Sequence, residues 1–316
     1  MSFVDALTQA ILPVLAMAAL GYLLGRVKEI RIDPLSTVNI YILLPALVFS
    51  SVATSTIGGS SFVTLAVGVV GFNLVMVAIA EGVAALIGET GPVRSGLVLT
   101  STFSNAGNYG IPLSAFAFGA TGRATAVLFI VVQMVTIYTI GVYVASRGTV
   151  ESWTRSLTEV FKLPLVYAVL AAALFRYLDV IPPAESNVMR VITLMGDASI
   201  PLMLILLGIQ LANTRYGTEM RRVVPPVGLK TIVAPLVAIA IALPLGFADP
   251  TVGRVFVLEC AMPAAVVPLL LTIEYSSESG PGSAPAYVST TILVSTVLSI
   301  PALAILITVL QSGVIL

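Results

Sequence analysis

The chain has 316 residues, of which 58% are hydrophobic and only 9% are charged, and its formal net charge is zero. A soluble domain carries about a quarter of its residues as charged groups, so the main outer solvent of this chain must be hydrocarbon. Zero net charge gives no electrostatic basis for nucleic-acid binding, and the lack of histidine, with Cys260 as the only cysteine, argues against zinc, haem and disulfide sites.

Ten apolar stretches are long enough to cross a bilayer, whose core of ~30 Å needs roughly 20 apolar residues per helix. Only helices or closed barrels satisfy their backbone in lipid, and runs of this length are helical. We expect spans at residues 4–27, 34–54, 61–87, 94–118, 123–146, 160–178, 186–212, 223–247, 251–273 and 286–313. The predicted fold class is therefore an all-α, multi-pass integral membrane protein.

Basic residues in the connections predict the orientation. If the N-terminus lies outside, eleven lysines and arginines, Lys230 among them, fall in inside loops and only four fall in outside loops. The positive-inside rule then places both termini outside the cytoplasm, in the cell membrane. On this assignment no basic side chain lies in the middle of the membrane.

The chain divides into two halves, residues 1–150 and 151–316, with five expected spans in each. An odd number of spans makes the second half enter the membrane from the opposite side, so a repeat would be inverted. Two proline pairs inside the spans share an offset of 156 residues: Pro45 with Pro201, and Pro112 with Pro268. The shared offset indicates two inverted five-helix repeats.

The most informative stretch is SNAGNYGIPL, residues 104–113, in the middle of the fourth span. Two glycines and Pro112 weaken the helix there, since proline cannot donate to the carbonyl four residues earlier. Asn105 and Asn108 can satisfy the freed backbone or a ligand, and the helix N-terminus beyond the break offers N–H groups to an anion. We predict a functional break, with a kinked helix packed through small residues as the alternative.

The ninth span carries a counterpart, ECAMPAAVVP at residues 259–268, in which two prolines five residues apart interrupt the helix twice. A carboxylate at this depth costs at least about 2.5 kcal/mol, so Glu259 should face a cavity, a cation or a partner. Glu259 could hold Na⁺ together with freed carbonyls, or carry a proton. The alternative is a position nearer the interface, since Arg254 is only five residues away.

Two further polar residues are candidates for coupling. Asp197 lies eleven residues into the seventh span, four before Pro201, and is the second acid expected to be buried; it could carry a proton or stabilise the Pro201 kink. Gln133 is central in the fifth span, where an isolated amide is more often a bond between helices than a ligand.

The chain resembles the auxin efflux carrier family in three motifs: YILLPAL at 41–47, NAGNYGIPL at 105–113 and AMP at 261–263. The resemblance covers essentially the whole chain. It implies a scaffold of helices 1, 2, 6 and 7, and a transport domain of helices 3–5 and 8–10 that moves like an elevator. It also implies that helices 4 and 9 are broken and cross at the substrate site, where Asn105 and Pro263 match the crossover residues of the family.

There are departures from the family pattern. Plant carriers place Asn-Pro at both breaks, whereas here Asn105 is followed by Ala106 and Pro263 is preceded by Met262, so one of the two amides is missing. The resemblance therefore does not imply that auxin itself is the substrate. Bile-acid:sodium symporters share the plan, and Glu259 is similar to their sodium-binding acid, which keeps sodium coupling open.

We expect a secondary active transporter, not an enzyme, for a small organic anion such as an auxin-like monocarboxylate or a dicarboxylate. The expected substrate contacts are Asn105, Gly107, Asn108, Tyr109, Met262, Pro263 and Ala264. Glu259, Asp197 or Gln133 would serve the coupling ion, Na⁺ or H⁺, and Pro45, Gly110, Pro112, Pro201 and Pro268 would break helices. The sequence leaves open a sodium-coupled carrier similar to the bile-acid symporters, a channel or receptor without transport, and a homodimer.

Overall fold

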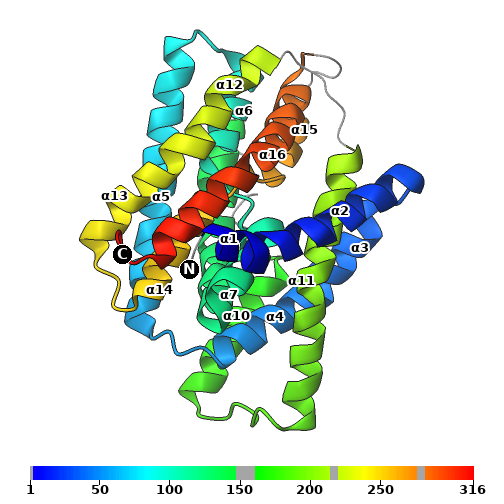
Figure 1. Cartoon of the computed structure of the whole chain (residues 1–316), viewed down its shortest axis with the longest axis vertical. Coiled ribbons are helices and arrows are strands. Elements are labelled where there is room, and N and C mark those ends of the chain that lie inside the picture. Colours follow the sequence, from blue (N-terminus) through cyan, green and yellow to red (C-terminus); the bar gives the residue numbers. More distant parts are fainter. Residues whose placement is uncertain (1–2, 147–160, 214–219, 276–281) are drawn as a thin grey trace.

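The computed structural model describes residues 3–146, 161–213, 220–275 and 282–316. Every regular element within these ranges is a helix (Figure 1), so the all-α prediction is confirmed. The predicted boundary between the two halves, at residue 150, lies outside the described residues. The inverted relation between the halves stays a prediction.

The elements follow one another with short connections, and several α-helices run directly into π-helical turns, labelled η. The first half contains α1 (Phe3–Ala6), η1 (Leu7–Ile11), α2 (Leu12–Val27), α3 (Ile32–Val38), η2 (Asn39–Leu43), α4 (Leu44–Ala53), α5 (Gly59–Leu86), α6 (Gly91–Thr102), η3 (Ala106–Gly110), α7 (Ile111–Thr136), η4 (Ile137–Gly141) and α8 (Val142–Ser146). The second contains α10 (Pro164–Tyr177), α11 (Asn187–Asn213), α12 (Met220–Gly228), η5 (Leu229–Val233), α13 (Ala234–Leu245), α14 (Pro250–Cys260), α15 (Val267–Tyr275) and α16 (Ala284–Gln311).

Seven of the described helices are long and apolar enough to cross a membrane, against the ten spans expected. The difference has structural causes. The fourth and ninth spans are each broken into two shorter helices. The second piece of the fourth span and the fifth span fall in one stretch, Ala106–Ser146, but Gly119 inside it has non-helical dihedral angles (φ 63°, ψ −146°) and kinks the chain between the two spans. The sixth span, Pro164–Tyr177, is a shorter apolar helix.

Most π-helical turns of this structure stand just before a proline, where they widen the helix without ending it. Four of the five described π-helical turns stand directly before a residue followed by proline: Pro13, Pro45, Pro112 and Pro235. A proline removes one hydrogen-bond donor and its ring pushes against the carbonyl of the preceding turn, and a π-turn accommodates both effects without ending the helix. The expectation that Pro45, Gly110, Pro112 and Pro201 break helices is therefore wrong. Gly110 is the last residue of η3, Pro45 and Pro112 lie in α-helices that continue from a π-turn, and α11 runs through Pro201. Pro268 is the second residue of α15, where no helical hydrogen bond is lost.

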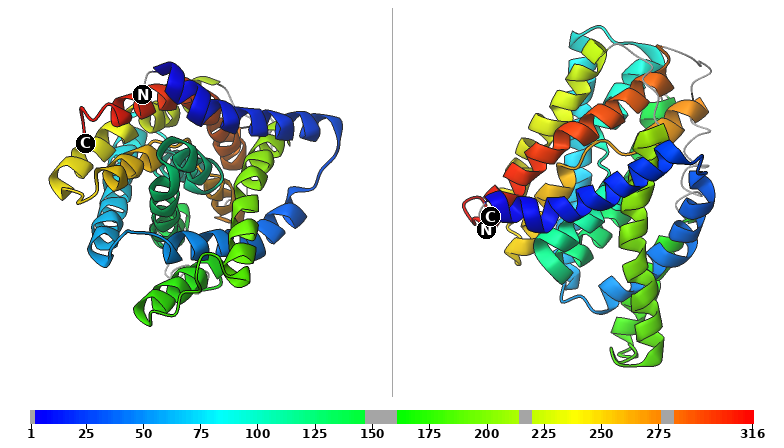
Figure 2. Two further views of the ribbon diagram at one scale, coloured as in Figure 1. Left: turned by 60° about the horizontal axis from the view of Figure 1, so that its bottom comes forward. Right: turned by 45° about the vertical axis from the view of Figure 1, so that its right-hand side comes forward.

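The helices pack in two groups (Figure 2). In one, α11 packs on α2 and on α4, and α10 packs on α4. The axes of α2 and α11 approach closely because Gly21 faces the backbone of Ile205 and Gly208 faces that of Ala18, leaving no room for a Cβ atom.

In the other group, α5, α6, α7, α13, α14 and α16 pack against one another. The two groups meet where α7 contacts α4, α11 and η1, where η3 contacts α11, and where α1 contacts α16. The contact between α1 and α16 brings the beginning and the end of the described chain close together, which agrees with termini on one side of a membrane (Figure 1).

Candidate substrate site at the crossing of two broken helices

Two helices of the second group stop at the same place. α6 ends at Thr102 and α14 ends at Cys260, and the chain is not helical at residues 103–105 and 261–266. The two non-helical segments are hydrogen-bonded to each other: the N–H of Asn105 donates to the carbonyl of Pro263 (2.8 Å), and the N–H of Ala265 donates to that of Phe103 (2.9 Å). The predicted crossing of the broken fourth and ninth spans is confirmed, although the break lies before Gly107 rather than at Pro112.

One accessible side of the crossing lies where η3–α7 and α15 begin. Within the two breaks and the first turns that follow, the partly exposed residues are Gly107, Asn108, Val266, Val267 and Leu269, and Leu270 is exposed. All of them lie at the starts of these two helices. The first N–H groups of a helix have no intrahelical partner and carry the positive end of its dipole. The open side of the crossing is therefore electropositive, and it suits an anion.

Asn105 contributes a side chain whose hydrogen bonding is incomplete. It is 5% exposed, and its Nδ2 is buried without a hydrogen-bond partner in the part of the chain that the structure describes. Leaving such a donor unsatisfied costs about 1–3 kcal/mol, so a buried amide of this kind calls for a ligand or a water. A carboxylate oxygen would satisfy it.

The other predicted substrate contacts surround Asn105 but differ in access. Met262, Pro263 and Ala264 are buried within the crossing, and the N–H of Ala264 donates to Oγ of Ser295 on α16 (3.2 Å). Tyr109 is 2% exposed, and its hydroxyl lies beside Ser299 of α16. These residues shape the crossing and pack it against α16.

Glu259 is fully buried at the end of α14, as predicted. Its Oε1 accepts a hydrogen bond from Oγ of Ser114 (2.6 Å), and its Oε2 has no hydrogen-bond partner among the described residues. Gly110 packs so closely on this carboxyl group that a Cβ atom there would overlap it. Within the described ranges no three Asp, Glu, Cys or His side chains cluster as metal ligands. A sodium ion at Glu259 would therefore need hydroxyl or carbonyl oxygens as its other ligands.

Gln133 stabilises the non-helical segment of the fourth span by a hydrogen bond. It is 2% exposed, and its Nε2 donates to the carbonyl of Ser104 (2.7 Å), one of the backbone groups freed by the break. Thr136 on the same helix donates to the Gln133 carbonyl (2.9 Å) and accepts from Nδ2 of Asn73 on α5 (2.8 Å). Amides of α5 and α7 thus hold the non-helical segment in place.

Lys230 is the residue that sequence reasoning missed. It lies in η5 and is only 1% exposed, although its charge had been assigned to an inside loop. Its Nζ donates to Oγ of Ser104 (2.7 Å) and to the carbonyls of Cys260 (3.0 Å) and Thr102 (3.3 Å). The prediction that no basic side chain lies mid-membrane is wrong. The signal was present, since Lys230 falls seven residues inside the expected span 223–247.

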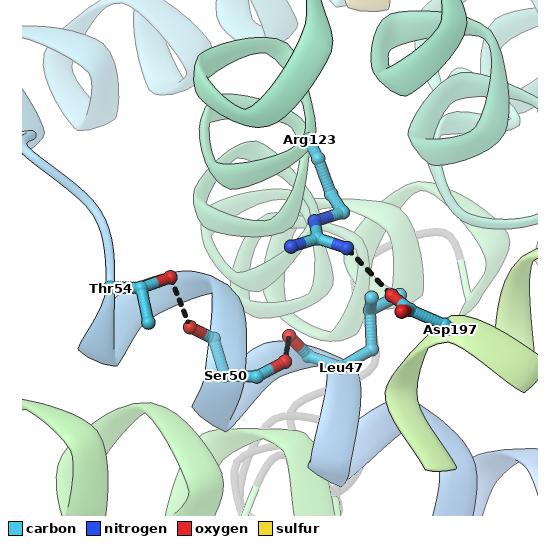
Figure 3. Close-up of polar contacts among 5 residues, drawn as sticks. All are labelled: Leu47, Ser50, Thr54, Arg123 and Asp197. Carbon is cyan, nitrogen blue, oxygen red and sulfur yellow. Dashed lines mark hydrogen bonds and ion pairs between the residues drawn. The ribbon is translucent and has the colours of Figure 1, made fainter. Parts of the chain in front are cut away.

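Asp197 is not the second buried acid. Its side chain is 55% exposed and forms an ion pair with Nη1 of Arg123 (2.8 Å). Figure 3 shows this pair beside Leu47 and Ser50 of α4. The pair connects α11 in one helix group with α7 in the other.

Two comparisons relate the chain to known proteins. The family described as "Membrane transport protein" matches residues 6–307. A protein of Methanothermobacter thermautotrophicus named "Uncharacterized transporter" is 27% identical over 303 residues, which cover 94% of this chain and 96% of that protein. Both similarities extend over the two broken spans.

Proposed function

The chain belongs to this membrane transport protein family, the family of the auxin efflux carriers, and from that membership we propose that it is a secondary carrier of a small organic anion. The observation that carries the proposal is the unsatisfied amide of Asn105 beside the starts of η3–α7 and α15. A carboxylate placed there receives a hydrogen bond from the amide and faces two helix N-termini.

The site favours a mono- or dicarboxylate over larger anions. Among the partly exposed side chains at the crossing, Asn108 is polar, whereas Val266 and Val267 are apolar. A small carboxylate needs only the amide and the backbone N–H groups, and its apolar part packs on the valines. The basic residues of the loops predict that both termini lie outside the cytoplasm, and the substrate would move between the two aqueous sides of the cell membrane.

Transport then moves the crossing relative to the membrane. The group containing α5–α7 and α13–α16 slides as one body against α2, α4, α10 and α11, because the crossing is hydrogen-bonded entirely within the first of these groups. The ion pair between Arg123 and Asp197 joins the two groups and must break during this movement.

Sodium or proton coupling is the second part of the proposal, and Glu259 is the residue that carries it. Its Oε2 is buried and lacks a partner in the described chain, so a proton or a sodium ion would satisfy it. The same unpartnered oxygen supports the alternative of a sodium-coupled carrier similar to the bile-acid symporters. A channel or a receptor would use the same crossing without the sliding movement.

The test is charge movement on solid-supported membranes, with malonate, malate and indole-3-acetate applied to proteoliposomes with and without Na⁺ at two pH values. We expect a saturable current with at least one carboxylate, and its dependence on Na⁺ or on pH identifies the ion at Glu259. The current should disappear in Asn105→Ala and persist in Asn187→Ala, a matched change at an exposed asparagine at the start of α11. Equal currents in the two variants would refute the assignment of Asn105.

A further inference from the structure

The crossing also has a second side, opposite the helix N-termini, where Lys230, Ala261 and Pro263 line a cavity of about 380 Å³. α6 and α14 both end there, with the carbonyls of Thr102 and Cys260 pointing to one place. The C-terminus of a helix carries the equivalent of roughly half a negative charge, so two such ends repel each other in a buried site unless a cation lies between them. In secondary transporters, half-helix C-termini and unwound carbonyls are groups that bind Na⁺.

The cation between these two ends is a side chain of the protein. The ammonium of Lys230 has three N–H donors, and the structure gives it three oxygen acceptors: both terminal carbonyls and Oγ of Ser104. No acidic side chain in the described ranges forms an ion pair with Lys230. Its Nζ lies 5.6 Å from the ring centroid of Phe72 on α5, within the range of a cation–π interaction.

Lys230 reaches this place because of its backbone. It is the second residue of η5, the π-turn that precedes Pro235, and it comes from the middle of the helical stretch Met220–Leu245. Pro235 accounts for the widened turn, and this turn carries the buried lysine. The position is thus fixed by α12–α13, a third segment beyond the two that cross.

We infer that Lys230 is the resident cation of the crossing: its tethered ammonium occupies the oxygen site between the two half-helix C-termini in place of an exchangeable metal ion. The wild-type protein therefore requires no Na⁺ at this position. Removal of the side chain leaves a site for a small monovalent cation. The inference rests on the proposed function only in treating the crossing as the substrate site, and its test involves no organic anion.

The experiment measures thermal unfolding of purified protein in NaCl, in methylammonium chloride and in N-methyl-D-glucamine chloride at equal ionic strength. The wild type should have the same Tm in methylammonium and in N-methyl-D-glucamine chloride, and any rise of its Tm in NaCl should disappear in Glu259→Gln. Lys230→Ala should have a lower Tm in N-methyl-D-glucamine, and methylammonium or Na⁺ should raise it in a saturable manner. Lys230→Met, which fills the space without the charge, should lose stability and gain none back from either cation. Lys28→Ala, at an exposed lysine after α2, is the matched control and should behave as the wild type.

Two results would overturn the inference. One is a Lys230→Ala protein as stable as the wild type in every salt. The other is a saturable stabilisation of the wild type by Na⁺ that persists in Glu259→Gln, because sodium bound elsewhere than at Glu259 would then coexist with the lysine. This second arm uses protein that keeps Lys230, so it decides the question even where Lys230→Ala does not fold.

Discussion

The contact between Gly110 and Glu259 allows a quantitative prediction. A Cβ atom at position 110 would lie 2.7 Å from Cδ and 2.8 Å from Oε1 of Glu259 and would overlap Oε2, so Gly110→Ala must displace the carboxyl group. The displacement breaks the hydrogen bond with Ser114 (2.6 Å), and a bond of this kind contributes about 1–3 kcal/mol. The change from glycine to alanine inside a helix itself stabilises the protein by about 0.5–1 kcal/mol, because alanine loses less backbone entropy on folding. We therefore expect a net loss of up to about 2.5 kcal/mol, together with altered ion dependence of transport.

The matched control is Gly82→Ala, at an exposed glycine inside α5 where a Cβ atom meets nothing within 4 Å. This variant should gain stability by about 0.5–1 kcal/mol. A double-mutant cycle isolates the contact, since Gly110→Ala should be harmless in a Glu259→Ala background. Thermal unfolding measures all four proteins. If Gly110→Ala were as benign as Gly82→Ala in the wild-type background, the close packing on Glu259 would be refuted.

Three further predictions concern groups around the crossing and between the helix groups. Gln133→Leu leaves the carbonyl of Ser104 without its donor and should cost about 1–3 kcal/mol in thermal unfolding; unchanged stability would show that Gln133 does not support the break. Asp197→Asn removes an exposed ion pair with Arg123 worth at most about 1 kcal/mol, so the Tm should hardly change while transport becomes faster. Loss of Na⁺ or pH dependence in that variant would instead make Asp197 the coupling group. Gly208→Leu would drive a side chain into the backbone of α2 and should prevent stable folding, which expression and size-exclusion chromatography would reveal; a well-folded variant would contradict the close approach of α2 and α11.

The sequence predicted the broken helices because their causes are local. Glycine, asparagine and proline around residues 105–112 weaken the helix whatever surrounds them, and backbone broken at membrane depth has to be buried in protein or line a cavity. The location of the break within each span was not predictable. A proline such as Pro112 can be accommodated by a π-turn, and whether the helix widens or stops depends on partners from other spans, here the carbonyl of Pro263 and the amide of Gln133.

The burial of the charged residues could likewise be predicted only in part. The burial of Glu259 could be predicted from its depth in an apolar stretch, but a similar argument failed for Asp197, because one face of α11 at that depth is open and offers Arg123 as a partner. Lys230 was misplaced because positive charge near the end of an apolar stretch usually marks a loop. Its acceptors come from spans four and nine, and no pattern in its own span indicates that two helix ends meet there.

Counterflow in proteoliposomes shows whether a small organic anion is carried at the crossing. Vesicles loaded with unlabelled malonate or malate are diluted into a trace of the same labelled compound, which only a carrier that exchanges bound substrate will accumulate. We expect transient accumulation with the wild type and with Asn187→Ala, and none with Asn105→Ala. Accumulation that is unchanged in Asn105→Ala would contradict the placement of the substrate beside that amide, and rapid equilibration without overshoot in the wild type would indicate a channel.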